Sequence, residues 1–203
     1  MKMTADPNRH DAEAGRTPMP LGESFDDVLA AAKTGAEWAW AALYRSIAGQ
    51  VIGYLRSRGA SEPEDVTSEA FLNVARAIHG FEGNENSFRS WIFVIAHRRL
   101  IDDRRAASRR PAEAGRLIEP KSEPVGGNVE VEAVDRLVTD ELLKAFDHLT
   151  EGQRDVLGLR IIAALSLEET AQVVGKSVGA IKALQRRGLE TLREKIDSEG
   201  VTL

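Results

Sequence analysis

The chain has 203 residues and no cysteine, which excludes disulfides, thiolate metal sites and cysteine nucleophiles. Hydrophobic residues make up 42% of the sequence and charged residues 29%, as in ordinary globular proteins. No apolar run is long enough to cross a bilayer, and the polar N-terminus lacks the apolar segment of a secretory signal. We therefore expect a cytoplasmic protein without membrane insertion.

The formal net charge is −5, but the two signs are unevenly distributed along the chain. Acidic residues gather in the N-terminal arm and over 62–69, whereas basic residues gather over 98–110 and 176–195. Two separate basic patches on an acidic chain favour selective over indiscriminate binding to DNA. We expect weak binding to naked DNA unless a partner holds the chain there.

The first part of the chain combines a polar arm with helical periodicity. Residues 1–23 are polar and contain prolines, which predicts a disordered arm. Over 25–58 apolar side chains recur at steps of three and four residues, which predicts helical structure up to Gly59. Ser61 is the expected N-cap of a further helix that runs to Gly80.

The helix expected after Ser61 has an apolar face and an acidic face. Its inner stripe consists of Val66, Ala70, Val74 and Ile78. Its opposite face carries Asp65, Glu69 and Leu72. An acidic face with an exposed leucine suits the docking of a basic partner. Taken alone, however, the segment favours a helix that simply faces solvent.

A polar loop over 82–87 leads into a helix predicted from about Phe88 to Ala107. One side of this helix, which includes Trp91, is expected in the core. A basic stripe on another side comprises Arg98, Arg99 and Arg105. A basic stripe beside a loop with asparagine side chains can hold a single strand and pocket an unstacked base. On this segment alone, a solvated helix with internal ion pairs is an equal alternative.

Prolines and glycines interrupt the helical pattern between the two halves of the chain. They predict a linker over 107–133, after which helical periodicity returns. The sequence contains neither strand-like alternation nor an internal repeat. The expected fold is therefore all-α, with two small helical domains joined by a flexible linker. The domains span 24–106 and 134–197, with the disordered arm over 1–23 and a tail over 198–203.

The strongest local signal lies over 165–184, LSLEETAQVVGKSVGAIKAL. It predicts a helix, a tight turn at Gly175 and a second helix capped by Ser177. Small Ala171, four residues before the glycine, allows the two helices to cross closely. The outward face of the second helix carries Lys182, Gln185 and Arg186. Donor side chains in this position are typical of a major-groove recognition helix, although a plain helical hairpin with a solvated basic face is an alternative.

Catalytic chemistry finds little support in the sequence. The four histidines are scattered without the spacing of a zinc site, and no glycine-rich phosphate loop is present. The carboxylates of Asp65 and Glu69 could share a metal, but no histidine accompanies them. We therefore expect no enzyme, no metal site and no cofactor.

Together these motifs resemble the extracytoplasmic-function (ECF) sigma factors, the small two-domain promoter-recognition subunits of bacterial RNA polymerase. The resemblance covers about Phe25 to Ile196. The sigma-2 domain is matched by WAALYRSIAGQVIGYLRSRG, PEDVTSEAFLNVARAIHGF and SFRSWIFVIAHRRLIDDRR. The sigma-4 domain is matched by LTEGQRDVLGLRIIAALSLEETAQVVGKSVGAIKALQRRGLETLREKI. Ordered motifs at the expected separations are more specific than any one of them alone.

The resemblance implies an alternative sigma factor that directs transcription initiation, with an anti-sigma factor as a further partner. The acidic helix would dock on the clamp of the largest subunit of core RNA polymerase through Asp65, Ser68, Glu69 and Leu72. The next loop and helix would bind the melted −10 element of promoter DNA through Asn84, Asn86, Ser87, Trp91, Arg98, Arg99 and Arg105. The sigma-4 domain would read the −35 element as duplex through Arg160, Ser177, Lys182, Ala183, Gln185, Arg186 and Arg187.

The chain departs from the family pattern in three places. Ser68 stands where a glutamine is usual in the docking motif, and Arg98 stands where many relatives carry asparagine beside the flipped-base pocket. Leu184 and Gln185 replace a more usual Arg-Leu pair. These differences leave both the −10 and the −35 sequence preference open.

Two other classes of protein compete with this interpretation. A conventional helix-turn-helix regulator would sense a ligand or dimerise through its first lobe and need not bind core polymerase. A helical antagonist that mimics a sigma factor would keep its activity after charge reversal at Lys182 and Arg186. Affinity for core polymerase and sensitivity to those two substitutions separate the three hypotheses.

Overall fold

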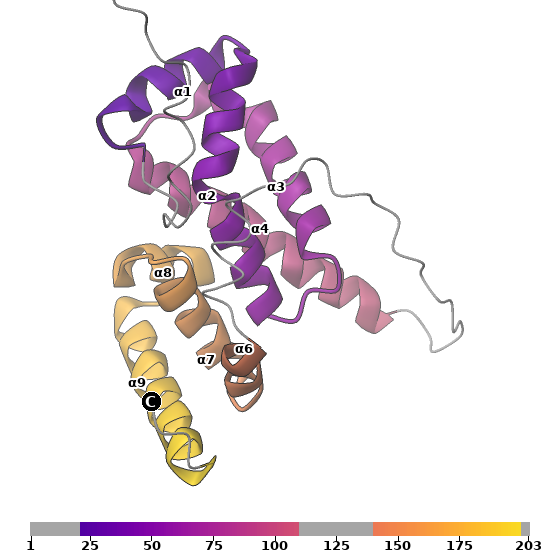
Figure 1. Cartoon of the computed structure of the whole chain (residues 1–203), viewed down its shortest axis with the longest axis vertical. Coiled ribbons are helices and arrows are strands. Elements are labelled where there is room, and N and C mark those ends of the chain that lie inside the picture. The colour runs from indigo at the N-terminus through magenta and orange to yellow at the C-terminus, as the bar shows by residue number, and fades with distance from the viewer. Residues whose placement is uncertain (1–20, 110–139, 200–203) are drawn as a thin grey trace, which may run out of the picture.

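The computed structural model describes residues 21–109 and 140–199, and within these ranges every regular element is a helix. The helices form two lobes, which Figure 1 shows one above the other. The all-α prediction is therefore confirmed. The predicted arm up to residue 20, the linker from residue 110 onwards and the last four residues of the predicted tail lie outside the described residues.

The first lobe is built around α2, which packs against α1, α3 and α4. Its elements are η1 (Gly22–Ser24), α1 (Phe25–Lys33), α2 (Glu37–Ser57), α3 (Pro63–Ala77), η2 (Ile78–Gly80) and α4 (Glu85–Arg109). The side chains of Leu43, Val51 and Leu55 in α2 are fully buried. All four residues of the predicted inner stripe of α3 and η2 are buried too, so the helical periodicity correctly identified the core.

In the second lobe, the long C-terminal helix packs along a much shorter helix that precedes it in the chain. Its elements are α6 (Asp140–Asp147), α7 (Glu151–Leu157), η3 (Gly158–Ile162), α8 (Leu167–Val174) and α9 (Val178–Glu199). α9 lies against α7, where a Cβ atom at Gly188 would approach Cδ1 of Leu157 to 2.9 Å. A glycine at this position therefore allows the two helices to approach closely.

Two capping boxes fix where α7 and α8 begin. The Thr150 hydroxyl accepts a hydrogen bond from the Gln153 amide at 3.4 Å, and the Gln153 carboxamide accepts one from the Thr150 amide at 2.8 Å. Ser166 and Glu169 repeat this reciprocal pattern at 3.1 and 2.6 Å. Amides at a helix N-terminus lack partners within the helix, so these side chains fix its first residue.

Two helix starts in the first lobe differ from the sequence predictions. The helical periodicity over 25–58 is broken at Gly35, where a left-handed φ of 86° separates α1 from α2. Ser61 is not the N-cap of α3: that position belongs to Glu62, whose side chain makes no capping hydrogen bond. Glu64, three residues after Ser61, forms an ion pair with Arg56 at 2.7 Å.

α4 is longer than predicted at both ends. It begins at Glu85 rather than at Phe88, because the Asn84 side-chain oxygen accepts hydrogen bonds from the amide and hydroxyl of Ser87 at 2.9 and 3.0 Å. It continues to Arg109, beyond the domain boundary expected at residue 106. Half of the predicted polar loop is therefore the first turn of α4.

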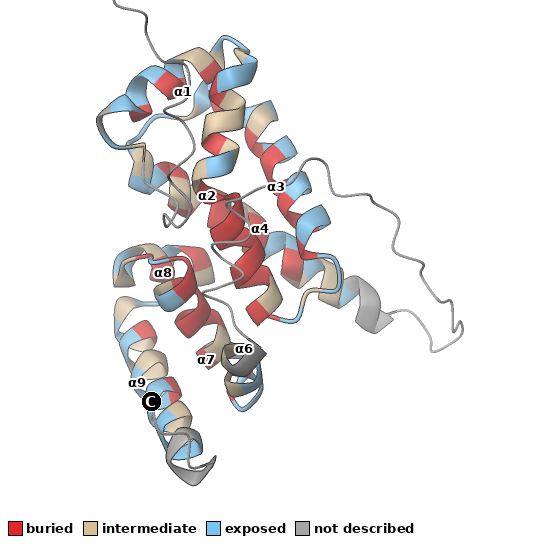
Figure 2. Cartoon of the chain, in the orientation of Figure 1, coloured by how far each residue is buried: buried red, intermediate tan, exposed pale blue. Residues whose placement is uncertain are grey.

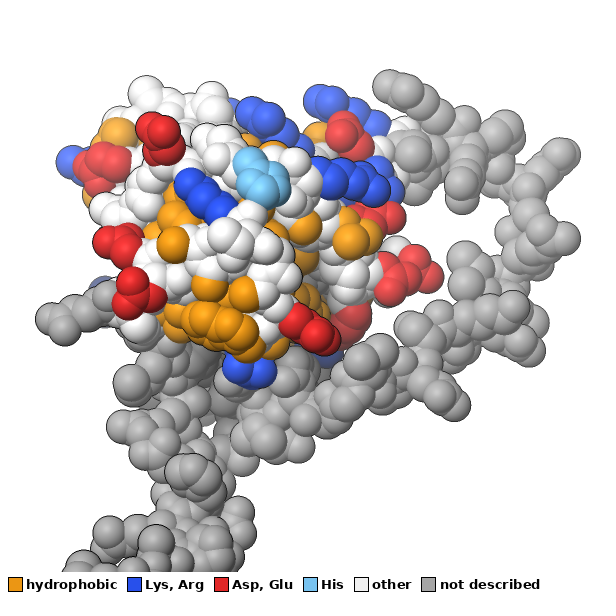
Figure 3. Space-filling view, turned by 90° about the horizontal axis from the view of Figure 1, so that it is seen from above, with side chains coloured by type: hydrophobic (Ala, Val, Ile, Leu, Met, Phe, Trp, Pro, Cys, Tyr) orange, Lys and Arg blue, Asp and Glu red, His pale blue; other side chains and the backbone are white. Residues whose placement is uncertain are grey.

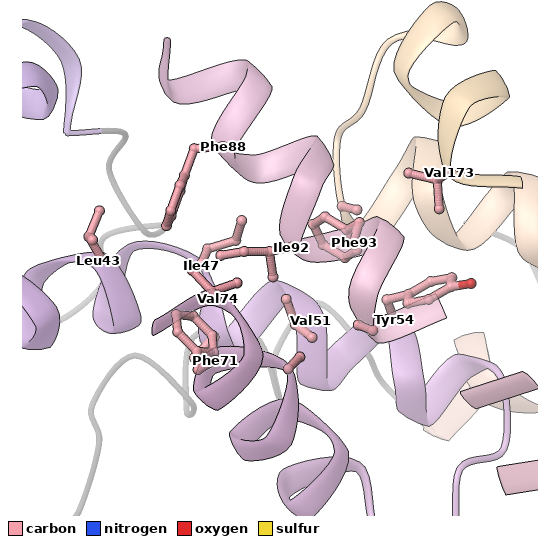
Figure 4. Close-up of a cluster of buried hydrophobic side chains, with 14 of the residues drawn as sticks. Leu43, Ile47, Val51, Tyr54, Phe71, Val74, Phe88, Ile92, Phe93 and Val173 are labelled. Carbon is pink, nitrogen blue, oxygen red and sulfur yellow. The ribbon is translucent and has the colours of Figure 1, made fainter. Parts of the chain in front are cut away.

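The two lobes pack directly against each other. α8 lies along α4, and η3 contacts α2. The first-lobe core extends into the second lobe, which contributes Leu159, Ala163, Leu165 and Val173. Figure 2 shows the buried residues concentrated in the middle of α2 and in the adjoining helices of the second lobe. Figure 4 shows Val173 on the same side of the cluster as Phe93 and Tyr54.

Leu43→Ala tests this core. The Leu43 side chain is fully buried, so its truncation should lower the free energy of unfolding by about 2–5 kcal/mol. Urea unfolding followed by circular dichroism measures the change. Leu72→Ala is the matched control, because Leu72 is 56% exposed and its truncation should change the stability by less than about 0.5 kcal/mol. Equal losses for the two variants would contradict the described packing.

Candidate nucleic-acid interface and docking face

The predicted helix-turn-helix is formed by α8 and α9. Gly175 ends α8 in the left-handed conformation with a φ of 69°, which glycine adopts without strain. The small side chain of Ala171 and that of Ile181 are buried between the helices. The Ser177 hydroxyl accepts a hydrogen bond from the Ala180 amide at 3.3 Å and caps α9 as predicted. The local sequence rules therefore correctly predicted the geometry of this motif.

The outward face of α9 carries exposed basic side chains. Lys182 has neither a hydrogen bond nor an ion pair with any described residue. Arg186 forms an ion pair with Glu190 at 2.9 Å, and Nε of Arg187 donates to the carbonyl oxygen of Ala183 at 3.3 Å. Both of these contacts lie within α9 and are exposed. Such a surface offers donors to phosphate and to the acceptor atoms of guanine.

Arg160 and Gln185, which are also predicted at the −35 element, are hydrogen-bonded to each other. Arg160 is half-buried, and its Nε donates to Oε1 of Gln185 at 3.3 Å. Its Nη1 donates to the carbonyl oxygen of Leu165, next to Ala164, whose φ of 52° is left-handed. Arg160 thus braces the loop before α8. A contact of Arg160 or Gln185 with DNA stays a prediction.

Of the residues predicted at the −10 element, Asn84, Asn86 and Ser87 lie at the start of α4, and the others follow along the helix. Asn86 and Ser87 are exposed in its first turn, and the Asn84 side chain caps the helix. Trp91 differs from them because its ring stacks on that of Phe81, with centroids 5.0 Å apart and planes inclined by 11°. The half-buried indole therefore belongs to an aromatic cluster that supports the loop.

The basic stripe of α4 is only partly available. Arg98 is exposed and makes no ion pair within the described ranges. Nε of Arg99 lies 2.5 Å from Oε2 of Glu69 in α3, and Arg105 lies 3.8 Å from Asp102. Arg98 is therefore the member of the stripe best placed to meet an incoming phosphate.

The predicted docking face of α3 is exposed as expected. Asp65, Glu69 and Leu72 all face solvent, and Leu72 is 56% exposed. The Ser68 hydroxyl donates to the carbonyl oxygen of Glu64 at 2.9 Å. Because Glu69 pairs with Arg99, this face adjoins the basic stripe of α4. The structure thus places the predicted docking face beside the predicted −10 surface.

Hydrogen bonds tie the beginning of the described chain to the start of α4. The Glu85 carboxylate accepts from the amides of Leu21 and Gly22 at 2.7 and 2.9 Å. Nζ of Lys33 donates to the carbonyl oxygen of Phe81 at 2.7 Å. η1 and α1 therefore brace the loop that leads to the residues predicted at the −10 element. Sequence reasoning missed this arrangement because the contacts span at least 48 residues.

A buried polar cluster between the lobes was also missed. Nε of Arg58 lies 2.5 Å from Oδ1 of Asp155, in an ion pair without the alignment of a hydrogen bond. The Tyr54 hydroxyl lies 2.7 Å from Nδ1 of His97 and 3.3 Å from Oδ1 of Asp155. The only local sign of this cluster in the sequence is Arg58, a charged residue that follows an apolar helix and precedes Gly59.

Burial shifts the pKa of two members of this cluster, Tyr54 and His97. Desolvation, reinforced by the negative charge of Asp155, raises the pKa of Tyr54 well above its ordinary value. Desolvation also lowers the pKa of His97, although the Asp155 carboxylate opposes the shift. His97 is therefore neutral near pH 7, and its ring nitrogen meets the Tyr54 hydroxyl without a net charge.

The exposed surface of the first lobe carries both signs of charge. Figure 3 looks onto the end of this lobe and shows acidic and basic side chains interspersed around hydrophobic ones. Across the described ranges, no group of three or more His, Asp or Glu residues could hold a metal ion. No helix within residues 21–109 or 140–199 is long and apolar enough to span a membrane.

Two family models match the chain: Sigma-70 region 2 over residues 43–110 and Sigma-70 region 4 over residues 145–194. The chain is 33% identical to the ECF RNA polymerase sigma factor SigD of Mycobacterium tuberculosis, over 88% of this chain and 87% of SigD. It is 34% identical to the ECF RNA polymerase sigma factor BldN of Streptomyces coelicolor, over 82% of this chain. It spans 63% of the length of BldN.

A solved structure shares the fold. The structure of CnrH in complex with the cytosolic domain of CnrY matches with a TM-score of 0.61 and 21% identity, over 87% of this chain and 99% of that one. The chain belongs to the ECF RNA polymerase sigma factors and is an alternative sigma factor. The resemblance inferred from the sequence motifs is therefore confirmed.

The lowered pKa of His97 predicts a pH dependence. The ordinary pKa of histidine is about 6.5. Below that pH the unfolded chain binds a proton that the folded chain resists, so the free energy of unfolding should decrease as the pH is lowered. One such proton contributes at most about 1.4 kcal/mol per pH unit. Urea unfolding between pH 7.5 and 5.5 measures the slope.

His97→Gln is the control, because glutamine keeps a polar side chain but does not titrate. Its slope over the same pH range should be shallower than that of the wild type. The facing groups Arg58, Arg104, Glu151 and Asp155 are shared by both proteins, so their contributions cancel in the comparison. Identical slopes would exclude a proton-resistant His97.

Proposed function

We propose that this sigma factor uses three surfaces, and that each performs one step in promoter recognition. The outward face of α3 docks on the clamp of the largest subunit of core RNA polymerase. The loop before α4, together with α4, binds the melted −10 element, and α9 reads the −35 element as duplex. The exposure of Lys182 and Arg186 on α9, opposite the buried Ile181, is the observation that carries this assignment.

The chemistry of each surface supports its assigned partner. α9 presents cationic donors, as phosphates and guanine edges require. α3 presents carboxylates around Leu72, which suits a basic partner with an apolar contact at its centre. α4 carries exposed Asn86 and Ser87 in its first turn and exposed Arg98 farther along, which suits a single strand whose bases are unstacked.

The free chain should bind DNA weakly. Arg99, Arg105 and Arg186 each have an acidic partner in the structure, so DNA must displace a carboxylate before it gains the contact. Polymerase would supply the missing affinity by holding both DNA-binding surfaces near their elements. We propose that this takes place in the cytoplasm, and that an anti-sigma factor regulates it.

Docking on polymerase can be tested with Asp65→Asn and Leu72→Ala. Each removes one contact from the outward face of α3 and should weaken the affinity for core polymerase about tenfold, or about 1.4 kcal/mol. Fluorescence titration of labelled sigma factor with core enzyme measures the constant. Glu194→Gln, which neutralises an exposed carboxylate on α9, should bind as the wild type does. Wild-type affinity in both α3 variants would exclude this docking face.

DNA reading can be tested by run-off transcription with core polymerase on a genomic fragment library. The wild type should give discrete start sites that share two spaced upstream elements. Lys182→Ala and Arg186→Ala should each cost about 1–3 kcal/mol of promoter affinity if the side chain reads a base edge. Lys144→Ala, another exposed lysine of the second lobe, should have no effect. If the wild type gives no new starts, the proposed function is wrong.

A further inference from the structure

The first helical segments of the described chain hold both ends of the loop before α4. Nζ of Lys33, the last residue of α1, donates to the carbonyl oxygen of Phe81 at 2.7 Å. The Glu85 carboxylate accepts from the amides of Leu21 and Gly22 at 2.7 and 2.9 Å. Leu21, η1 and α1 together form what we call the amino-terminal brace. The loop between its two polar contacts runs from residue 81 to residue 85.

An aromatic contact fixes the brace to α4 at a third point. The ring of Phe25, the first residue of α1, lies 5.7 Å from the ring of Phe88, and both residues are buried. The Phe88 ring in turn lies 5.6 Å from the ring of Phe81 at an angle of 79°, a favourable geometry for two aromatic rings. Phe81 is therefore held through its ring as well as through its carbonyl oxygen.

Both polar contacts of the brace involve a charged group. The Lys33 ammonium meets a neutral carbonyl oxygen, and the Glu85 carboxylate meets two neutral amides. Hydrogen bonds of this kind are shorter and stronger than those between two neutral groups. Glu85 is also the first residue of α4, where the helix dipole favours a negative charge. Removal of either charge should therefore loosen one end of the loop.

The loop itself folds back on the first turn of α4. Residues 82–84 lie between the two fixed ends, and all three are exposed. A Cβ atom at Gly83 would lie 2.9 Å from Cβ of Ser87 and 3.2 Å from Cζ of Phe81. The Asn84 side chain accepts hydrogen bonds from the amide and the hydroxyl of Ser87. The loop thus has one compact conformation, which depends on what holds its ends.

The brace lies outside the part of the chain that the family models match. The Sigma-70 region 2 model begins at residue 43, whereas α1 ends at Lys33. Figure 1 shows α1 at the end of the first lobe that lies away from the second lobe. The loop and the matched part of α4 belong to region 2, but the family match covers neither Lys33 nor Leu21.

We propose that Lys33 and Glu85 are positioning residues for the −10 element, which hold the loop in the shape that receives the unpaired strand. The inference rests on the proposed function, which assigns that strand to this loop and to α4. A loop that is ordered before binding adds no further entropic cost when the strand binds. A loop that samples several shapes also accommodates several bases. The brace therefore contributes to both the affinity and the base preference of the surface.

Three substitutions test the two polar contacts. Lys33→Met keeps the apolar stem of the side chain but has no ammonium donor. Lys33→Arg restores a cationic donor and should retain the wild-type behaviour. Glu85→Ala removes the acceptor at the other end of the loop. Arg45→Met and Glu37→Ala are the charge-matched controls, because each removes one exposed charged side chain of α2 in the same lobe.

The probe is the fluorescently labelled non-template −10 strand of a promoter that run-off transcription has mapped. Its binding is measured to holoenzyme assembled from core polymerase and each sigma variant, and compared with that of a strand in which one −10 base is replaced. Lys33→Met and Glu85→Ala should each weaken binding of the native strand about tenfold and reduce the preference over the replaced strand. Their affinity for core polymerase should stay at the wild-type value, and both controls should match the wild type throughout.

Two results would overturn the positioning role. One is wild-type strand affinity and base preference in both Lys33→Met and Glu85→Ala. The other is an equal loss of strand affinity and core affinity with an unchanged base preference, because that pattern would assign the two side chains to the stability of the lobe alone.

Failure of the proposed function gives a different pattern. Hydrogen exchange of the amides over 81–87 is measured in the free sigma factor, without polymerase or DNA, and should be faster in Lys33→Met and Glu85→Ala than in the wild type. If exchange responds in this way but wild-type holoenzyme binds no −10 strand, the assignment of the strand to this surface is wrong. The positioning role would be overturned with it, whereas the contact between the brace and the loop would be supported.

Discussion

The burial of α2 on every side is the constraint on which the rest of the molecule depends. Every residue from Ile47 to Leu55 is buried, so this stretch has no face left for solvent. α1, α3 and α4 cover it within the first lobe, and η3 and α6 approach it from the second. A helix that is apolar all round needs neighbours on all sides. The requirement is met only when both lobes contribute.

The two proposed DNA-binding surfaces of this acidic protein offer few unpaired charges, which agrees with the weak binding to naked DNA that we expect. The basic side chains of α4 are partly paired with carboxylates of α3 and of α4 itself, and Arg186 of α9 is paired within its helix. Within the described ranges Arg98 and Lys182 have no acidic partner, and Arg187 donates to the carbonyl oxygen of Ala183 rather than to a carboxylate. On the proposed function, specificity would depend on where the lobes are held, because each surface alone offers few unpaired charges.

The sequence could predict what short-range rules determine. The left-handed turn at Gly175, the cap at Ser177 and the buried stripe of α3 all depend on residues a few positions apart. The Arg58–Asp155 pair could not be found in this way, because apolar periodicity carries no information about which distant charge will be buried beside which. Trp91 shows an intermediate case, in which the helix face was correct but the stacking on Phe81 depends on loop geometry.

The ion pair between Arg58 and Asp155 has a consequence for evolution. The two family models match separate parts of the chain, one in each lobe, so exchange of one lobe between relatives would produce a hybrid. A chimera that kept Arg58 but received a second lobe without an acid at position 155 would bury a guanidinium whose remaining ion pair, to Glu151, is largely exposed to solvent. Such a hybrid should fold less well until either residue is replaced. The two positions are thus expected to change together during divergence, which makes the lobes a co-inherited unit.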